Sequence, residues 1–399
     1  MTPGPGISRT PLPKGFSASG INCGVRKYRP DLGIIVSDRD AITAGVFTKN
    51  EAKAASVLYS QDMLPSKHIR AVITNSGQAN AATGEQGAIN NRTMADVASR
   101  WIGCRRHQVL TASTGVIGVQ LEIDKIVEAI PHLLEKGSDF AEPFALAILT
   151  TDLIPKTVTT QVSLSEGEIR ITGICKGSGM IHPNMATMLG YLLTDVEMPY
   201  EIAHEILTEA VDVSFNMMSV DGDTSTNDCT FLLANGASGI SLKTDEDLLK
   251  FKRALIEVSI TLAKAIARDG EGADRLVEVE VKNAPSLDLA RKAARGITVS
   301  PLIKCALQGA DPNWGRILAK LGSVGVPSAC LERMSLSLQN ILVFEAGAPA
   351  LFNRTEVRLL MKGDTVRIGI DLKSGSEAAT AWGCDLSKRY IDINAEYST

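Results

Sequence analysis

Strand-like and helix-like segments follow one another along this chain in no regular order, and this order is what most constrains its fold. Short apolar runs rich in β-branched residues predict strands at Leu32–Val36, Ala44–Phe47 and Arg70–Thr74. Apolar residues at helical spacing predict helices at 85–102, 120–136, 139–149, about 199–213 and 245–268. No fixed-length repeat and no regular strand–helix–strand alternation accompanies them. The sequence therefore predicts an irregular α/β protein.

A β-hairpin is predicted at 157–175, because two alternating runs flank a turn at Ser165–Glu168. We expect Pro131 to interrupt the second predicted helix. The first twenty residues are rich in proline and are expected to form an extended arm. Further strands are expected at 229–234, 276–281, 334–344 and 365–372.

Composition removes several classes of protein. With 399 residues, the length alone favours two or three domains, and a net charge of −4 argues against non-specific nucleic-acid binding. No run of 18 apolar residues and no secretory leader pattern is present. Seven cysteines without a Cys-x-x-Cys pair and five scattered histidines show no zinc-ligand spacing, so no metal is expected. We therefore expect a cytoplasmic α/β enzyme without disulfides.

Five segments hold more glycine and small polar residues than a core or a simple turn requires, and such loops often carry binding groups. They are 75–84, 111–118, 176–189, 221–228 and 311–316. Ser113–Gly115 is either an ordinary turn or an oxyanion hole, since glycine lets amide donors approach a developing negative oxygen. The acids of 221–228 do not match a calcium loop, and Lys176 precedes its glycines, unlike a phosphate-binding loop. No Gly-x-Ser-x-Gly elbow is present, which argues against an α/β-hydrolase.

Thr187 lies between apolar residues in Met185–Leu189, where a threonine is ordinarily a strand residue. A threonine hydroxyl becomes a useful nucleophile when the residue is N-terminal, because its own α-amine then serves as the base. An internal threonine reaches that state only if the preceding peptide bond is cut. Here that bond joins Ala186 to Thr187, and the small alanine leaves room for hydroxyl attack on its carbonyl.

Taken together and in this order, the segments resemble the ornithine acetyltransferase family, also called the bifunctional glutamate N-acetyltransferase or ArgJ family of arginine biosynthesis. The resemblance runs from Thr43–Thr48 to Asn394–Thr399 and is carried chiefly by the surroundings of Thr187, by 221–228 and by Gly309–Arg316. It implies a precursor that cleaves itself between Ala186 and Thr187 into an α chain, 1–186, and a β chain, 187–399. The implied fold has mixed β-sheets packed with helices in a self-processing, N-terminal-threonine-nucleophile architecture.

The resemblance also implies an activity. Thr187 would take the acetyl group of N2-acetyl-L-ornithine, and L-glutamate would then remove it as N-acetyl-L-glutamate, in a ping-pong reaction. Position by position, the matching residues are Thr114 and Gly115 for the oxyanion hole, and Thr150, Lys176, Thr187, Glu271, Asn394 and Thr399 for substrate binding. Thr151 is the alternative to Thr150. The segments 221–228 and 311–316 are expected to order loops near the site.

The family further implies an α2β2 heterotetramer that needs no cofactor. The residues leave open whether acetyl-CoA is a second donor, and whether the enzyme serves primary or secondary metabolism. Two alternatives belong to other classes. One is a related self-processing amidase or aminopeptidase, which passes the acyl group to water, and the other is an uncleaved, non-catalytic homologue.

Overall fold

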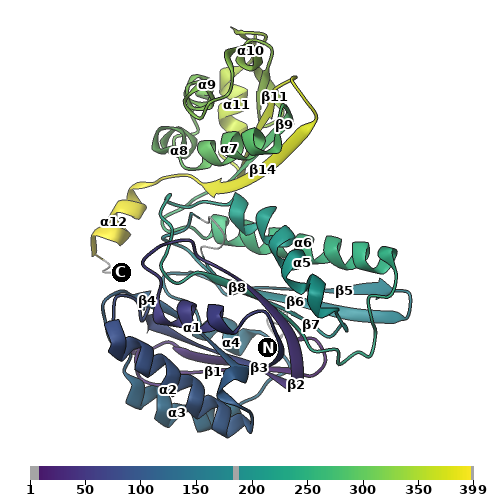
Figure 1. Cartoon of the computed structure of the whole chain (residues 1–399). Coiled ribbons are helices and arrows are strands. Elements are labelled where there is room, and N and C mark those ends of the chain that lie inside the picture. The colour runs from purple at the N-terminus through teal and green to yellow at the C-terminus, as the bar shows by residue number, and fades with distance from the viewer. Residues whose placement is uncertain (1–8, 183–187, 397–399) are drawn as a thin grey trace, which may run out of the picture.

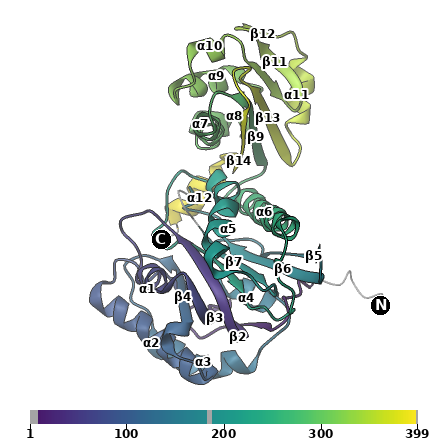
Figure 2. The ribbon, with the colours of Figure 1, turned by 45° about the vertical axis from the view of Figure 1, so that its right-hand side comes forward.

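The computed structural model describes residues 9–182 and 188–396. Three predicted site residues, Ala186, Thr187 and Thr399, lie outside these ranges. Two bodies are stacked in Figure 1 and Figure 2: a larger one built on an eight-stranded sheet and a smaller one built on a six-stranded sheet. The C-terminal helix returns from the smaller body to the larger one (Figure 1).

The eight-stranded sheet has the order β4-β3-β2-β8-β7-β6-β5, with β1 also paired to β2. Its strands are β1 (Phe16–Ile21), β2 (Leu32–Phe47), β3 (Ser66–Gln78), β4 (Val109–Val116), β5 (Lys156–Leu164), β6 (Gly167–Lys176), β7 (Leu189–Thr194) and β8 (Cys229–Ala234). The pairs β3–β4 and β7–β8 are parallel and the other pairs are antiparallel, so the sheet is mixed.

The helices of the larger body cover both faces of this sheet. They are α1 (Ala55–Met63), α2 (Gly84–Ile102), α3 (Ile123–Glu135), α4 (Glu142–Ala147), α5 (Tyr200–Asp212) and α6 (Asp245–Arg268), with short 3₁₀ turns η1 (Arg106–Gln108) and η2 (Phe215–Met217). Alternation along β2 divides the core: Ile34 packs with the cluster of α2 and α3, whereas Ile35 packs on the opposite face with Phe144 of α4.

The smaller body holds a sheet of order β12-β11-β10-β13-β9-β14. Its strands are β9 (Leu276–Ala284), β10 (Ser335–Leu338), β11 (Ile341–Glu345), β12 (Ala348–Pro349), β13 (Thr365–Asp371) and β14 (Glu377–Cys384). Its helices are α7 (Leu287–Thr298), α8 (Pro301–Gln308), α9 (Trp314–Ser323), α10 (Ser328–Leu331) and α11 (Arg354–Leu360), and α12 (Lys388–Glu396) follows β14.

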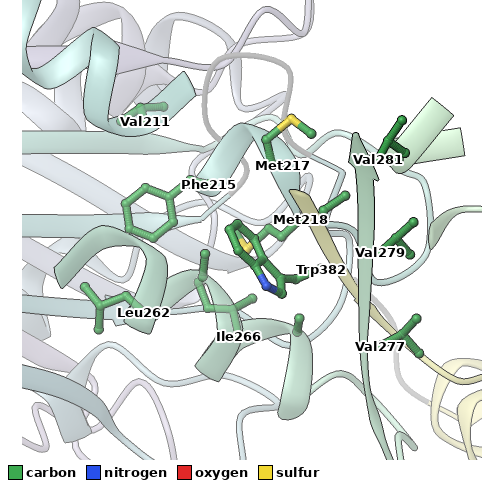
Figure 3. Packing of buried hydrophobic residues seen from close by; sticks show 14 of the residues in the cluster. Val211, Phe215, Met217, Met218, Leu262, Ile266, Val277, Val279, Val281 and Trp382 are labelled. Atoms are coloured by element: carbon green, nitrogen blue, oxygen red, sulfur yellow. The ribbon is translucent and has the colours of Figure 1, made fainter. Parts of the chain in front are cut away.

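One hydrophobic cluster runs through both bodies. Phe215, Met218 and Ile266 of the larger body meet Trp382 of β14, and the row Val277, Val279 and Val281 of β9 extends the cluster into the smaller sheet (Figure 3). Backbone contacts accompany the packing, since the amide of Ser219 donates to the Trp382 carbonyl. The junction between the sheets is therefore a packed core.

Most predicted elements are present, and α6 shows why. The Thr244 side chain accepts the Asp247 amide, and the first turn is acidic while Arg268 lies in the last turn. The predicted break at Pro131 is wrong, because α3 continues through it. The predicted arm instead contributes β1 to the sheet.

The predicted strand 334–344 is two strands. β10 and β11 form a hairpin whose turn residues, Gln339 and Asn340, both have positive φ angles, 52° and 64°. Two such residues make the kind of two-residue turn that matches the twist of a hairpin. Asparagine–glycine is the usual pair there, so the sequence carried only a weak turn signal.

Candidate functional site

A cavity of about 220 Å³ lies where the end of β4, the end of β6, the loop 221–228 and helix α12 meet. Of the residues singled out from the sequence, the following line it: Thr114, Gly115, Thr150, Thr151, Lys176, Glu271 and Asn394. Met188, which directly follows Thr187 in the chain, lines it as well. The cavity thus gathers every described residue of the predicted site.

Thr114 and Gly115 end strand β4 rather than forming a free turn. Their parallel partners on β3 are Ser76 and Gly77. Gly115 has a φ of 129°, and a Cβ there would lie 2.3 Å from the Gly77 carbonyl carbon. No other residue type fits without moving the strand. The close approach of the two glycines brings the backbone of Gly115 to the cavity wall.

Lys176, at the end of β6, is buried, and its Nζ donates to Thr150 Oγ1 at 2.7 Å and to Thr114 Oγ1 at 3.3 Å. Burial lowers the pKa of the lysine, and the nearby Asp152 carboxylate opposes that shift. Thr151 also lines the cavity, but the hydrogen bond to Lys176 is made by Thr150. The ammonium is therefore held between two threonine hydroxyls.

Glu271 follows α6 and is also buried. Its Oε2 accepts from Asn394 Nδ2 at 2.8 Å, so α12 contacts the site through a carboxylate. A Cβ on Gly179 would lie 2.4 Å from the Glu271 carboxyl carbon, which makes Gly179 necessary for this placement. The last described residues form a docked helix rather than a frayed tail. The Lys176 cation and the Glu271 anion give the cavity one group for each charge of an amino acid.

The loop 221–228 orders its surroundings, as expected. Asp221 accepts the amides of Met180 and Ile181 at 2.6 and 2.8 Å. Asn227 Nδ2 donates to the carbonyls of Ala79 and Ser113, and so ties the loop to the ends of β3 and β4. Together these bonds fix the walls of the cavity on both sides.

Several residues that line the cavity were not predicted as site residues, and three of the polar ones are Asp228, Tyr390 and Asn227. Asp228 is buried, burial holds its pKa well above the usual range, and its Oδ2 has no hydrogen-bond partner within residues 9–182 and 188–396. Burial also raises the pKa of Tyr390, which lies on α12. Asn227 is the third. Only the crowding of polar residues at 221–228 pointed toward two of them.

The segment 311–316 is not near the site, contrary to expectation. Asn313 caps α9, where its side chain accepts the Arg316 amide, and Asp311 pairs with Arg354. No residue of this segment lines the cavity. Its polar residues serve a helix start in the smaller body.

Arg275 lies four residues after Glu271 in the chain but does not face it. Its Nη1 donates to the carbonyls of Leu307 and Gln308 and faces Asp385. The guanidinium therefore points to α8 and away from Glu271. Arg275 does not line the cavity.

Metal ligands do not gather at the site: within the part of the chain that the structure describes, no cluster of three or more His, Cys, Asp or Glu side chains could hold an ion. All seven cysteines lie in that part and are free thiols. Among the same residues, no helix is both long enough and apolar enough to span a membrane.

Comparisons with known proteins point to one family. A family model described as the ArgJ family matches residues 17–399. The arginine biosynthesis bifunctional protein ArgJ of Thermotoga neapolitana is 44% identical and aligns with 97% of this chain and 100% of its own length. The protein of the same name from a Synechococcus species is also 44% identical, over 97% and 96%.

A solved structure is similar as well. The crystal structure of arginine biosynthesis bifunctional protein ArgJ from Bacillus halodurans is 38% identical, with a TM-score of 0.51. It matches along 100% of its own chain but covers only 53% of this one. The resemblance stated from the sequence is thereby confirmed, together with the α/β fold of mixed sheets.

Proposed function

This chain belongs to the ArgJ family, and we propose from that premise that it is a glutamate N-acetyltransferase acting on N2-acetyl-L-ornithine. The observation that carries the proposal is the single cavity around which Thr114, Gly115, Lys176 and Glu271 meet. These residues come from segments as distant as β4 and the end of α6. Their chemistry is what acyl transfer between two amino acids requires.

The first half-reaction starts at Thr187. Its α-amine takes the hydroxyl proton, and Oγ attacks the acetyl carbon of acetylornithine. The carbonyl oxygen becomes negative, and we assign its stabilisation to Thr114 and the backbone at Gly115. The C–N bond then breaks, the amine returns the proton to the leaving nitrogen, and ornithine leaves an acetyl ester on Thr187.

The second half-reaction runs the same steps in reverse. The α-amine of glutamate attacks the ester carbonyl, the oxyanion forms again, and Thr187 Oγ leaves with a proton. We assign the substrate carboxylate to Lys176 and an amine to Glu271, with Thr150, Asn394 and Thr399 as further contacts. These assignments follow charge, since a buried lysine and a buried glutamate gain most from an opposite charge.

We also propose that the precursor cleaves itself between Ala186 and Thr187. β6 and β7, which flank this bond in the chain, are antiparallel neighbours, with Lys176 opposite Leu189. A cut between them leaves both strands in the sheet, so the pieces stay together. The solved Bacillus halodurans chain lends support, because its 53% share of this chain is the length of the proposed β chain.

Mass spectrometry of the purified protein tests both parts. We expect two chains, 1–186 and 187–399, and one added acetyl group on the β chain alone after incubation with N2-acetylornithine. Thr187→Ala should give a single uncleaved chain. A single intact 42.5 kDa species that Thr187→Ala leaves unchanged contradicts the proposal. Acetyl release that does not depend on glutamate would favour the amidase alternative.

We propose an α2β2 assembly in the cytoplasm and a reaction that needs no cofactor, since the steps above use only side chains and backbone amides. Activity should survive EDTA, and native mass spectrometry should give two copies of each chain. A panel of acetylornithine, acetylglutamate and acetyl-CoA as donors, with glutamate or ornithine as acceptor, decides whether acetyl-CoA also serves.

A further inference from the structure

Four charged side chains are buried together behind the cavity. Lys156 Nζ lies 2.7 Å from Asp152 Oδ1 and 2.6 Å from Asp269 Oδ2, and Lys176 Nζ lies 3.9 Å from Asp152 Oδ2. The side chains of Lys156 and Asp152 are fully buried. The cluster thus pairs two buried cations with two buried anions, and only Lys176 borders the cavity.

The two carboxylates also hold the segments that carry the proposed substrate contacts. Asp152 accepts the amide of Thr150 at 3.1 Å and that of Gly177 at 2.7 Å. Asp269 accepts the amide of Leu153 at 3.0 Å. The same turn continues to Glu271, whose amide donates to the Ser178 carbonyl. Lys156, the first residue of β5, joins these anchors through its ion pairs with both carboxylates.

Lys156 determines whether the Lys176 ammonium contacts the threonines at the cavity wall or the Asp152 carboxylate behind it. The Lys176 ammonium donates to Thr150 and Thr114 at the cavity wall, and it lies 3.9 Å from Asp152 Oδ2, close enough for an ion pair but too far for a hydrogen bond. The Asp152 carboxylate does not draw Lys176 away from the cavity wall, because Lys156 already neutralises this carboxylate at a shorter distance. Without Lys156, two buried carboxylates would face one lysine, and an uncompensated buried charge is strongly unfavourable. A rotation of the lysine side chain would relieve it.

We propose that Lys156 is a positioning residue that keeps the Lys176 ammonium directed at the cavity by occupying Asp152 and Asp269. The inference deepens the proposed function, on which it rests for the role of Lys176 in substrate binding. It predicts that the harm done by losing Lys156 comes from Asp152, which captures Lys176.

The charges around Lys176 also make a titration prediction. Asp152, Asp228 and Glu271 raise its pKa, whereas Lys156 and burial lower it. Removing Lys156 removes a repelling positive charge, so the pKa of Lys176 should rise. Removing the Asp152 carboxylate in the same molecule should lower it again.

Three variants separate positioning from a merely structural tie: Lys156→Met, Asp152→Asn and the double variant. Competitive labelling with trace acetic anhydride across pH, read by mass spectrometry of the Lys176 peptide, measures the pKa of Lys176 without substrate. We expect Lys156→Met to raise this pKa by about one unit and to raise KM for N2-acetylornithine more than it lowers kcat. The double variant should reverse both changes in part. Lys243→Met, which removes an exposed ion pair with Glu166, is the matched control and should change neither.

Two results overturn the proposal: a Lys176 pKa that Lys156→Met leaves unchanged, or a double variant with a higher KM than Lys156→Met. If Lys156 and Asp152 only hold the surrounding segments together, the second result is expected, because each substitution then removes one more stabilising contact. If Lys156→Met fails to fold, the comparison of Asp152→Asn with the double variant still tests the proposal. Their KM values should be similar, because both variants lack the Asp152 carboxylate that would capture Lys176. Labelling needs no turnover, so an inactive wild-type protein would refute the proposed function and leave the labelling result valid.

Discussion

At the scale of single residues, the site depends on a few groups whose surroundings change their chemistry. Lys176 is the clearest case, since burial lowers its pKa while two threonine hydroxyls keep it hydrogen-bonded. Gly115 is the backbone counterpart, because its contact with Gly77 admits no Cβ. The resemblance pointed to both residues, but only their neighbours explain why those residue types are needed.

A pH dependence follows from Lys176. In its proposed role the Lys176 ammonium binds a substrate carboxylate only while it is protonated, and its pKa lies below the usual lysine value. KM for N2-acetylornithine should therefore be low on the acidic side of that pKa and rise as pH rises through it. Steady-state kinetics across the alkaline range measures this rise in KM. Lys176→Met should raise KM at all pH values and abolish its rise at alkaline pH. A rise that persists in the variant contradicts the assignment of the substrate carboxylate to Lys176.

At the scale of elements, α12 matters because it carries Tyr390 and Asn394 to the cavity. It docks on the turn after α6, where Gly272 has a φ of 69° and a Cβ would lie 2.5 Å from the Tyr390 nitrogen. Arg389 and Asp274 pair across the same contact. Gly272, this exposed ion pair and the hydrogen bond from Asn394 to Glu271 together position the helix, and the contact at Gly272 is sterically the strictest of them.

Gly272→Ala should displace α12 and separate Asn394 from Glu271. We expect KM for both substrates to rise, while the free energy of unfolding falls by about 1 kcal/mol from the strained backbone. Gly239→Ala is the matched control, because Gly239 has a φ of 72° and open space around its Cβ position. It should lose similar stability without a change in KM. Equal KM values in the two variants would refute the role of α12.

At the scale of the whole molecule, the proposed chains are interleaved rather than adjacent. β7 and β8 would belong to the β chain, yet they lie between β2 and β6 of the proposed α chain. The core then continues through Trp382 into the smaller sheet (Figure 3). Two chains built in this way share one sheet and one core, so we expect them to separate only on unfolding.

Trp382→Ala should destabilise the whole molecule. The indole is 4% exposed, packs at the junction of the bodies and donates through Nε1 to Glu278. Removing a buried aromatic side chain of this size costs about 3–5 kcal/mol. Urea denaturation measures the loss. Trp101→Ala, at an indole that is 61% exposed, should change stability by about 0.5 kcal/mol or less. Similar losses in both variants would show that the junction contributes little.

Local sequence patterns determined much of the fold. Strand alternation predicted the β5–β6 hairpin, and apolar residues at helical spacing predicted α6, because these preferences act between residues close in the chain. The same reasoning failed at Pro131, where surrounding packing keeps α3 continuous, and at Gln339–Asn340, where an uncommon residue pair makes the turn.

The sequence by itself therefore determined the α/β class, most elements and, through the family resemblance, the residues of the candidate site. Tertiary structure alone decided that β3 and β4 bring Gly77 against Gly115, that α12 returns to Glu271, and that 311–316 lies elsewhere. It also decided that Lys156, Asp152 and Asp269 are buried behind Lys176. The reason is physical: propensity acts over a few residues, whereas contacts between distant segments, and the charges buried there, depend on how the sheets and helices pack.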